Sequence, residues 1–219
     1  MLRTTSVLAA ALVAALAAGS AGSQDGRGFT PHVTNPWFPL LRGSVYRYEG
    51  IKDGKRSHEV LTVTRRTKMV DGVRCIVVDD RLWVDGRLAE RTKDWYAQDR
   101  KGNVWYFGED TAELDRSGKV TTREGSWQAG VQGARAGILM PAEPRVGQTG
   151  LEEYWKGHAE DHFRVLGYLG RNGLLTEEWT PLEPGVRDHK LYVRGTGTVL
   201  ERTVRGGDEL NELVSVRRG

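Results

Sequence analysis

The sequence predicts an all-β protein in which an antiparallel meander is curled into a half-barrel or barrel. Beyond the N-terminal stretch, no window of about 12 residues places apolar side chains at helical spacing. Short runs of β-branched and aromatic residues dominate instead, and turns containing Gly, Asp or Asn separate them. About twelve strands result, too many for one flat sheet, so the sheet is expected to curl or fold over on itself, with little helix.

The N-terminus, residues 1–23, is expected to be a secretory signal peptide. Arg3 provides a positive start, Val7 through Ala18 is uninterrupted and apolar, and small residues suited to cleavage follow. The apolar run is about 12 residues long, whereas a membrane-spanning helix needs roughly 20. We therefore expect an exported protein, secreted or held in the periplasm or cell envelope, with no integral membrane segment in the mature chain.

The mature chain is expected to begin with a Pro-rich segment, residues 24–43, followed by a single β domain over residues 44–219. The prolines of the first segment cannot donate a regular ladder of hydrogen bonds. Its aromatic residues Trp37 and Phe38 are expected to plug it onto one end of the sheet.

Hairpin turns set the expected strand boundaries. Asp-Gly pairs at Asp53-Gly54, Asp71-Gly72 and Asp85-Gly86 are typical of tight two-residue turns. The expected strands are Ser44–Gly50, His58–Val70, Val73–Val84, Arg87–Gln98, Asn103–Gly108, Val120–Arg123, Leu151–Lys156, His162–Tyr168, Leu174–Thr180, His189–Arg194, Thr198–Val204 and Leu210–Val216.

One hairpin allows a register to be predicted. The residues from Asp99 to Asn103 suit a three-residue loop with Gly102 in the left-handed conformation. That register pairs Gln98 with Val104, Ala97 with Trp105, Tyr96 with Tyr106, Trp95 with Phe107, Asp94 with Gly108 and Lys93 with Glu109. One face, with Trp95 and Phe107, is expected to be core. The other face, two tyrosines flanked by an amide and a carboxylate, is expected to contact solvent or to line a wet cavity.

The segment Gly125–Gly150 interrupts the regular succession of predicted strands and turns. It holds six glycines and two prolines and is expected to be a Gly-rich loop across one opening of the barrel, although a packed surface loop is the alternative. Together with the amphipathic face of the hairpin, it supplies the candidate ligand-binding residues. These candidates are Tyr96, Gln98, Tyr106, Trp127 and Met140.

Composition excludes several classes of function. Lys and Arg number 32 against 29 Asp and Glu, the formal charge is +3, and the charges are interspersed, so no nucleic-acid-binding face is expected. Cys75 is the single cysteine and lies in an apolar run, which indicates a buried, inert thiol. Since no cysteine stands directly after the signal run, no lipid anchor through cysteine is expected. No cofactor is expected either.

The sharpest chemical candidate is the stretch His158–His162. A strand would place His158, Glu160 and His162 on one face, and a helix would stack His158, Asp161 and His162. Two imidazoles and a carboxylate would suit zinc or iron, although a solvated charged strand end is the alternative.

Other catalytic patterns are weaker. Glycoside hydrolysis needs two carboxyl groups that face each other across a cleft. Adjacent residues of a strand point to opposite faces, so neither Glu109-Asp110 nor Glu152-Glu153 can itself be such a pair. Gly125-Ser126-Trp127 does not fit the Gly-x-Ser-x-Gly nucleophile pattern.

Several motifs resemble a family of uncharacterised exported bacterial proteins. The matching stretches are Asn35–Leu40, Asp94–Asp99, Gly102–Glu109, Gly125–Trp127, Ala159–Asp161 and Thr180–Gly185. The stretch Leu191–Val199 is more loosely similar to the closing strands of half-barrel proteins like the periplasmic lipoprotein carriers. The resemblance implies a half-barrel but brings no activity and no catalytic residues.

The function expected from the sequence is non-catalytic binding of a hydrophobic or amphipathic small molecule, such as a lipid, in the concave face of the sheet. A metal-dependent enzyme that uses His158, Glu160 and His162 is the first alternative. An envelope interaction or scaffold protein with exposed aromatic residues is the second. The sequence leaves the ligand and the oligomeric state open.

Overall fold

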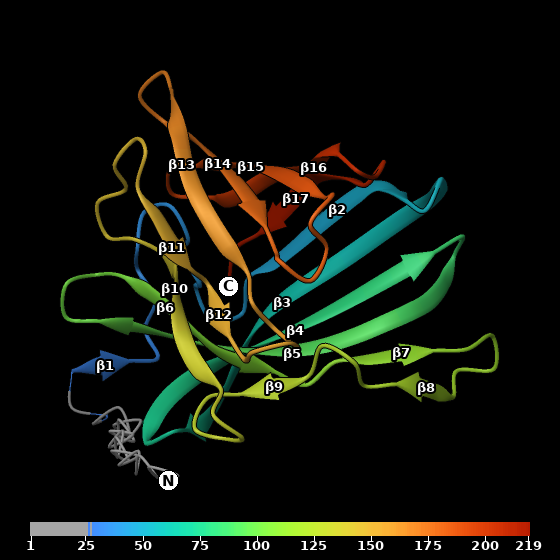
Figure 1. Cartoon of the computed structure of the whole chain (residues 1–219), viewed down its shortest axis with the longest axis horizontal. Coiled ribbons are helices and arrows are strands. Elements are labelled where there is room, and N and C mark those ends of the chain that lie inside the picture. Colours follow the sequence, from blue (N-terminus) through green and yellow to red (C-terminus); the bar gives the residue numbers. More distant parts are fainter. Residues whose placement is uncertain (1–25, 27) are drawn as a thin grey trace, which may run out of the picture.

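The structure is a computed structural model that describes residue 26 and residues 28–219, so the expected signal peptide lies outside the described residues. The all-β prediction is confirmed: the described chain forms an antiparallel sheet without helices, closed into a nearly complete barrel (Figure 1). None of the described residues forms a helix long and apolar enough to cross a membrane. The strands are β1 (Phe29–Thr30), β2 (Val45–Lys52), β3 (Lys55–Val70), β4 (Val73–Val84), β5 (Arg87–Asp99), β6 (Val104–Glu109), β7 (Ala112–Leu114), β8 (Val120–Thr122), β9 (Trp127–Gln128), β10 (Arg135–Met140), β11 (Thr149–Leu151), β12 (Glu153–Tyr154), β13 (His162–Leu169), β14 (Gly173–Trp179), β15 (Arg187–Val193), β16 (Gly197–Arg205) and β17 (Leu210–Arg217).

The long hairpins form where the Asp-Gly pairs predict them. Asp71 and Gly72 both have positive φ, 45° and 76°, in the turn that pairs Val70 with Val73. Asp-Gly turns with the same handedness join β2 to β3 and β4 to β5. Two positive φ angles in a two-residue loop match the right-handed twist of the flanking strands. These turns therefore fix the register of four consecutive wall strands.

The predicted β5–β6 hairpin is correct near its loop and wrong beyond it. The loop closes with Asp99 N donating to Asn103 O at 3.0 Å, and Tyr96 pairs with Tyr106 as expected. A bulge then shifts the pairing, so that Asp94 lies opposite Glu109 instead of Gly108. Gly108 has φ of +127°, and a Cβ there would lie 2.3 Å from the carbonyl oxygen of Trp127. The positive φ and the close approach of β9 both explain why a glycine stands at this bulge.

The Gly-rich segment is not a structureless loop, which corrects the prediction. Its residues include β9 and β10, and β10 pairs with β6 through Gly137 and Tyr106. A Cβ at Gly137 would lie 2.4 Å from the Leu151 carbonyl oxygen, so the missing side chain permits the strands to approach. Much of this segment is therefore barrel wall.

The barrel closes at a seam. β11 pairs with β13, whereas β12, which follows it directly, pairs with β10. Each short strand thus bonds to a different neighbour, and no ladder runs along the whole seam among the described residues. Around the rest of the wall the order is β13, β14, β15, β16, β17, β2, β3, β4, β5 and β6.

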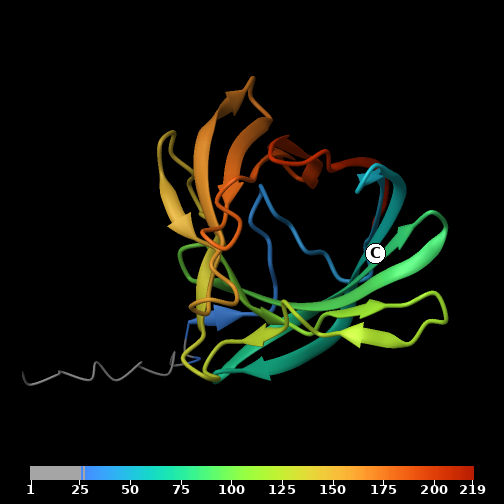
Figure 2. The ribbon, with the colours of Figure 1, turned by 45° about the vertical axis from the view of Figure 1, so that its right-hand side comes forward.

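The Pro-rich segment fills one end of the barrel, as the sequence predicts. Figure 2 shows it, in blue, crossing the space between the β13–β14 wall and the β3–β5 wall. Trp37 is 2 % exposed, Phe38 packs edge-on against Tyr96, and Tyr46 donates its hydroxyl to the Pro39 carbonyl oxygen at 3.2 Å. This segment and the apolar wall residues form the core.

Candidate functional site

The inward-facing residues change from apolar to charged at one level of the barrel. On β4, Val78 is followed two positions later by Asp80, and on β3 Leu61 is preceded by Glu59. On β15, Tyr192 is preceded by Lys190 in the same way. Because side chains alternate along a strand, each such pair shares the interior face. The interior therefore has a packed apolar half and a charged half.

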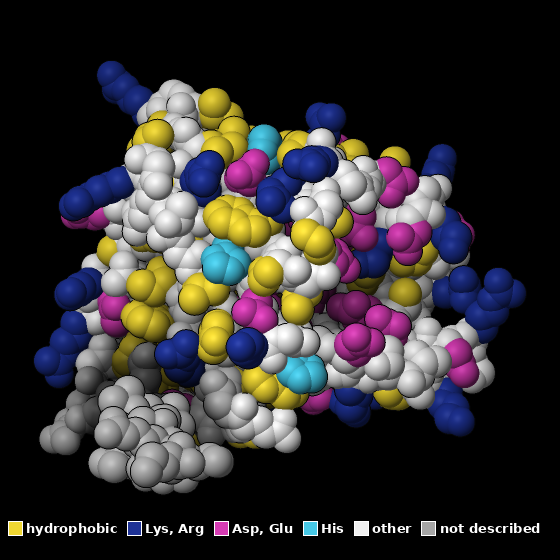
Figure 3. All heavy atoms as spheres, in the orientation of Figure 1, with side chains coloured by type: hydrophobic (Ala, Val, Ile, Leu, Met, Phe, Trp, Pro, Cys, Tyr) yellow, Lys and Arg dark blue, Asp and Glu magenta, His cyan; other side chains and the backbone are white. Residues whose placement is uncertain are grey.

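The charged half is dominated by carboxyl groups from many elements. We call these residues the acidic cluster. In Figure 3, Asp and Glu side chains gather around a hollow that overlies β4 and β5 in the orientation of Figure 1. The acidic cluster consists of Glu59, Asp80, Asp94, Glu109, Glu152, Glu153, Asp161, Glu178 and Glu201.

Burial raises the pKa of the deeply buried carboxyl groups in the cluster, of which Asp94 and Glu109 are examples. Asp94 is 7 % exposed, and burial raises its pKa to about 7, although the hydroxyl that Tyr106 donates to it at 2.8 Å acts in the opposite direction. Burial, together with the charges of Asp94 and Glu153, raises the pKa of Glu109 to about 9. A carboxyl group removed from water favours its neutral form. Part of the cluster therefore retains protons at neutral pH.

Two pairs of carboxyl groups face each other within the cluster. Burial raises the pKa of both Glu59 and Asp80, and a shared proton between them raises the pKa of Asp80 further while lowering that of Glu59. At the seam, Glu153 and Asp161 are related in the same way, with the proton on Glu153. Each pair is stable only when a proton or another donor lies between its oxygens.

Three buried polar atoms have no hydrogen-bond partner of standard geometry among the described residues. They are Asp80 Oδ1, Glu153 Oε2 and Trp127 Nε1. Buried polar atoms without partners are rare in folded proteins and cost roughly 1–3 kcal/mol each. All three belong to the acidic cluster or to the indole beside it, where the Trp127 indole lowers the pKa of Glu153 and the shared protons of the two carboxyl pairs lie next to these atoms.

Lys190 provides opposite charge on one side of the cluster. Its Nζ lies 2.6 Å from Glu178 Oε2 and 3.4 Å from Glu201 Oε1. Burial lowers the pKa of Lys190, but the carboxylates of Glu178 and Glu201 outweigh burial and raise it well above its usual value. The side chains of Lys190 and Glu201 remain 21 % and 40 % exposed, so solvent reaches this one side of the cluster.

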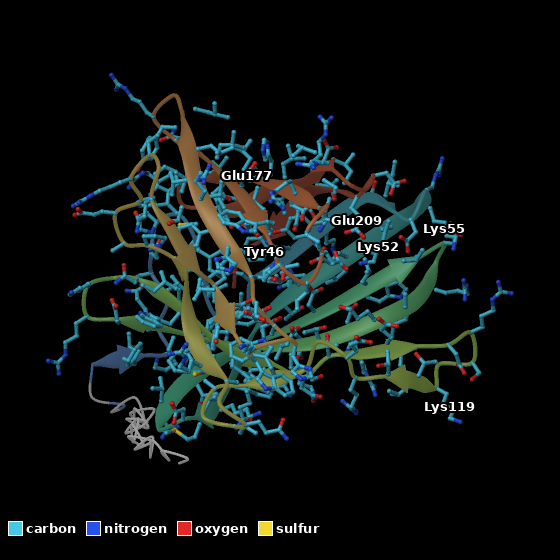
Figure 4. The ribbon with its side chains drawn as sticks, viewed as in Figure 1. Tyr46, Lys52, Lys55, Lys119, Glu177 and Glu209 are labelled. Atoms are coloured by element: carbon cyan, nitrogen blue, oxygen red, sulfur yellow. The ribbon has the colours of Figure 1, made fainter. Side chains whose placement is uncertain are left out.

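Among the pockets that border the cluster, one lies beside Glu59 and another beside Glu109. One, of about 210 Å³, lies at the β2, β3, β16 and β17 end and is lined by Glu59, Glu201 and Leu82 among others. At its rim Lys52 and Glu209, labelled in Figure 4, form an ion pair of 3.5 Å. The other pocket, of about 380 Å³, is lined by Glu109 and the indoles of Trp127 and Trp155. The cluster is thus approached from two sides.

The candidate ligand-binding residues of the sequence analysis lie at different places. Tyr96 and Tyr106 stack in the interior with ring centroids 4.8 Å apart, and Trp127 meets Tyr106 edge-on. Gln98 instead holds the Pro-rich segment, since its Oε1 accepts from the backbone N–H groups of residues 34 and 35 at 2.8 Å. Met140 is 1 % exposed within the core. Only the first three border the acidic cluster.

The candidate metal-binding residues are not brought together. The stretch containing His158 and Glu160 is a turn and its continuation, neither the strand nor the helix expected. His158 stacks on Trp155 at 3.9 Å, whereas His162 stacks on Trp179 at 5.3 Å. Across residues 28–219, no group of three His, Cys, Asp or Glu side chains is arranged to hold a metal ion. The geometry therefore gives no ligand set here.

The sequence analysis missed most of the acidic cluster. It placed Asp94 on the amphipathic face of its hairpin but did not follow the same alternation on other strands. The signal was present, because Asp80 and Lys190 each lie two positions from an inward apolar residue. Glu153 and Asp161 face each other across a local turn that the sequence analysis did not recognise, and their nearness to Glu109 follows from the seam, which no local pattern predicts.

Comparisons with known proteins give a coarse likeness only. No protein-family model matches the chain, and no curated protein matches it. A solved structure from Bacteroides fragilis, described as an exported protein with a YmcC-like fold, has a TM-score of 0.47 and 13% identity, covering 83% of this chain and 99% of its own. A structure from Parabacteroides distasonis, described as a lipoprotein, has a TM-score of 0.44 and 8% identity, covering 84% of this chain and 99% of its own. At such scores the likeness assigns neither family nor function.

Proposed function

We propose that this is an exported, non-catalytic protein that binds a small amphipathic organic molecule inside the barrel. The observation that carries the proposal is the divided interior: the packed half presents tyrosine rings, and the other half presents polar groups and is open to solvent on the side of Lys190. Small-molecule sites combine an apolar wall with a few oriented polar groups, as at the boundary between these halves. Export is supported by the apolar N-terminal run followed by small residues.

The apolar part of the ligand would lie against the tyrosine wall. Tyr96 and Tyr106 stack in parallel and the Trp127 ring closes one side, so together they offer a flat aromatic boundary. All three side chains are at most 9 % exposed, so a ligand would contact the edges of these rings and not their whole faces. A ligand with a short or slender apolar part suits this boundary better than a bulky one.

Binding is tested by native mass spectrometry of the mature protein, purified from a bacterium that exports it, and by uptake of the neutral dye Nile red. We expect a bound small molecule or saturable dye fluorescence. Ser57 lines the pocket of about 210 Å³, so Ser57→Trp should reduce dye uptake. Arg56→Trp, at the exposed neighbouring position, is the matched control. A wild-type protein that carries nothing and takes up no dye would contradict the proposal.

A further inference from the structure

We infer that this protein binds the surface of an anionic phospholipid membrane through the end of the barrel that the Pro-rich segment fills. Four segments at this end contact the Pro-rich segment through hydrogen bonds or ring contacts, and we call them together the filled end. The inference concerns the outside of the barrel, so it does not depend on what the interior binds. The filled end consists of residues 100–103, 141–148, 168–172 and 194–196.

Three apolar side chains are exposed together at the filled end. Val146 is 64 % exposed, Leu169 is 55 % exposed and Tyr168 is 45 % exposed. They come from two neighbouring segments, since Tyr168 donates its hydroxyl to the Pro144 carbonyl oxygen, and Figures 1 and 2 show both segments at the same corner of the molecule. Single exposed apolar residues are common, but several gathered at one place mark an interaction site.

The tip of the β13–β14 hairpin extends beyond the packed core. Consecutive side chains of a strand point to opposite faces, and Tyr168 and Leu169 are both about half exposed. Neither face of the hairpin is therefore fully covered at this level, whereas Phe163 and Val165, nearer to its base, are buried. Turns in water are normally polar, and an amphipathic tyrosine beside aliphatic residues suits the boundary between lipid headgroups and acyl chains.

The filled end also carries an excess of positive charge. Its four segments contain five basic residues against one acidic residue, Glu143. All five are exposed, and none of them forms an ion pair with a described residue. In Figure 3 several Lys and Arg side chains project along the left edge, where this end of the barrel lies. The basic residues are Arg100, Lys101, Arg145, Arg171 and Arg194.

The opposite end of the barrel does not share this charge. Apolar side chains such as Leu182 are exposed there as well, but most of the connecting turns carry an acid. Anionic lipids attract Lys and Arg and repel carboxylates, so this asymmetry directs the filled end toward the membrane. The acids in the turns of the opposite end include Asp53, Asp85, Asp115 and Asp208.

The combination of charge and apolar surface favours a membrane over a soluble polyanion. A polyanion in solution would pair with the basic side chains and leave the apolar ones in water. A membrane offers negative headgroups above an apolar layer, and binding to it grows with both buried apolar area and charge. The filled end matches this layering, because Arg145 directly precedes Val146 and Arg171 lies two positions after Leu169.

The first test measures co-sedimentation of the mature protein with vesicles of phosphatidylglycerol or of phosphatidylcholine. We expect at least tenfold tighter binding to phosphatidylglycerol, weakening as added salt screens the charges. Arg145→Gln combined with Arg171→Gln should weaken this binding at least tenfold, since each basic residue near an anionic surface contributes about fivefold. Arg116→Gln combined with Lys119→Gln, at exposed positions of the opposite end, is the matched control and should change it less than twofold.

A second test shows which part of the surface meets the lipid. Cys75 is the single cysteine and is fully buried, so Leu169→Cys provides one accessible thiol for an environment-sensitive dye such as nitrobenzoxadiazole. We expect its emission to shift to shorter wavelength when phosphatidylglycerol vesicles are added. Val214→Cys, at a position 53 % exposed on β17, is the matched control and should show no shift.

Several results would overturn the inference. Equal binding to both lipids, or binding to neither, would contradict an anionic membrane as the partner, even if a protein were captured instead. Binding that survives Arg145→Gln combined with Arg171→Gln, with the variant folded by circular dichroism, would place the contact elsewhere. A spectral shift at position 214 and none at position 169 would do the same. None of these results bears on dye uptake by the interior, which tests the proposed function separately.

Discussion

The raised pKa of Asp94 predicts that the protein loses stability as the pH rises through neutrality. Burial raises this pKa from 3.8 to about 7, so the folded state binds a proton that the unfolded state has released. Its contribution is therefore fully present below about pH 4 and is lost as the pH rises through about 7. Asp99 and Asp115 have lowered pKa values, and their contributions change only in more acidic solution.

The size of the effect follows from the shift. A shift of roughly three pKa units corresponds to about 4 kcal/mol, of which about 3 kcal/mol falls between pH 5 and pH 8. With a urea slope of about 1–3 kcal/mol per molar, the unfolding midpoint should move by about 1–3 M. Raised pKa values of Glu109 and Glu153 act in the same direction.

Urea titrations followed by tryptophan fluorescence at pH 5 and pH 8 measure this effect. Asp94→Asn keeps an oxygen that accepts the Tyr106 hydroxyl and cannot ionise, so its midpoint should change less between the two pH values than that of the wild type. Asp208→Asn, at an exposed position, should behave as the wild type. If Asp94→Asn and the wild type show the same change, or if stability rises with pH, the reasoning about the buried carboxyl is refuted.

Further predictions concern the turns, the plug and the thiol. Gly102 has φ of +93°, so Gly102→Ala should cost about 1–2 kcal/mol in chemical unfolding, whereas Gly185→Ala, with open space around it and no positive φ, should cost less; equal costs would contradict this. Trp37→Ala should lower the free energy of unfolding by about 3–5 kcal/mol, because Trp37 fills one end of the barrel, whereas Leu182→Ala, at an exposed site, should lower it by under about 1 kcal/mol. A Trp37→Ala protein as stable as the wild type would contradict the packing role of Trp37. Cys75 is fully buried and burial raises its pKa to about 12, so a thiol reagent at pH 8 should label it only after unfolding; rapid labelling of the native protein would contradict this.

Much of the wall could be predicted because its signals are local. Asp71-Gly72 defines a turn by its own backbone preferences, and the strands on either side follow from it. The seam depends on distant contacts instead. Gly137 belongs to a strand because β6 and the segment around Leu151 lie beside it, and a glycine-rich sequence gives no strand signal of its own. The Gly-rich segment was therefore expected to be a loop.

The residues of the site also differ in whether local signals or distant contacts place them. Tyr96 and Tyr106 could be paired from the sequence because one hairpin contains both. Glu153 and Asp161 face each other across a local turn in which Trp155 bridges to Ala159, whereas their nearness to Glu109 depends on the closure of the barrel, which joins segments far apart in the chain. Closure also determines which alternating positions face the interior. For this reason the sequence predicted an amphipathic face but not an acidic interior.

The central claim is that the carboxyl groups inside the barrel are withdrawn from water and retain protons. Carbon-13 NMR of the side-chain carboxyl groups, titrated from about pH 3 to pH 10 and assigned through Asp94→Asn and Glu109→Gln, measures this directly. The account predicts a midpoint near 7 for Asp94 and near 9 for Glu109. Midpoints close to 4 for both groups would show that water fills this half of the barrel and would contradict the account.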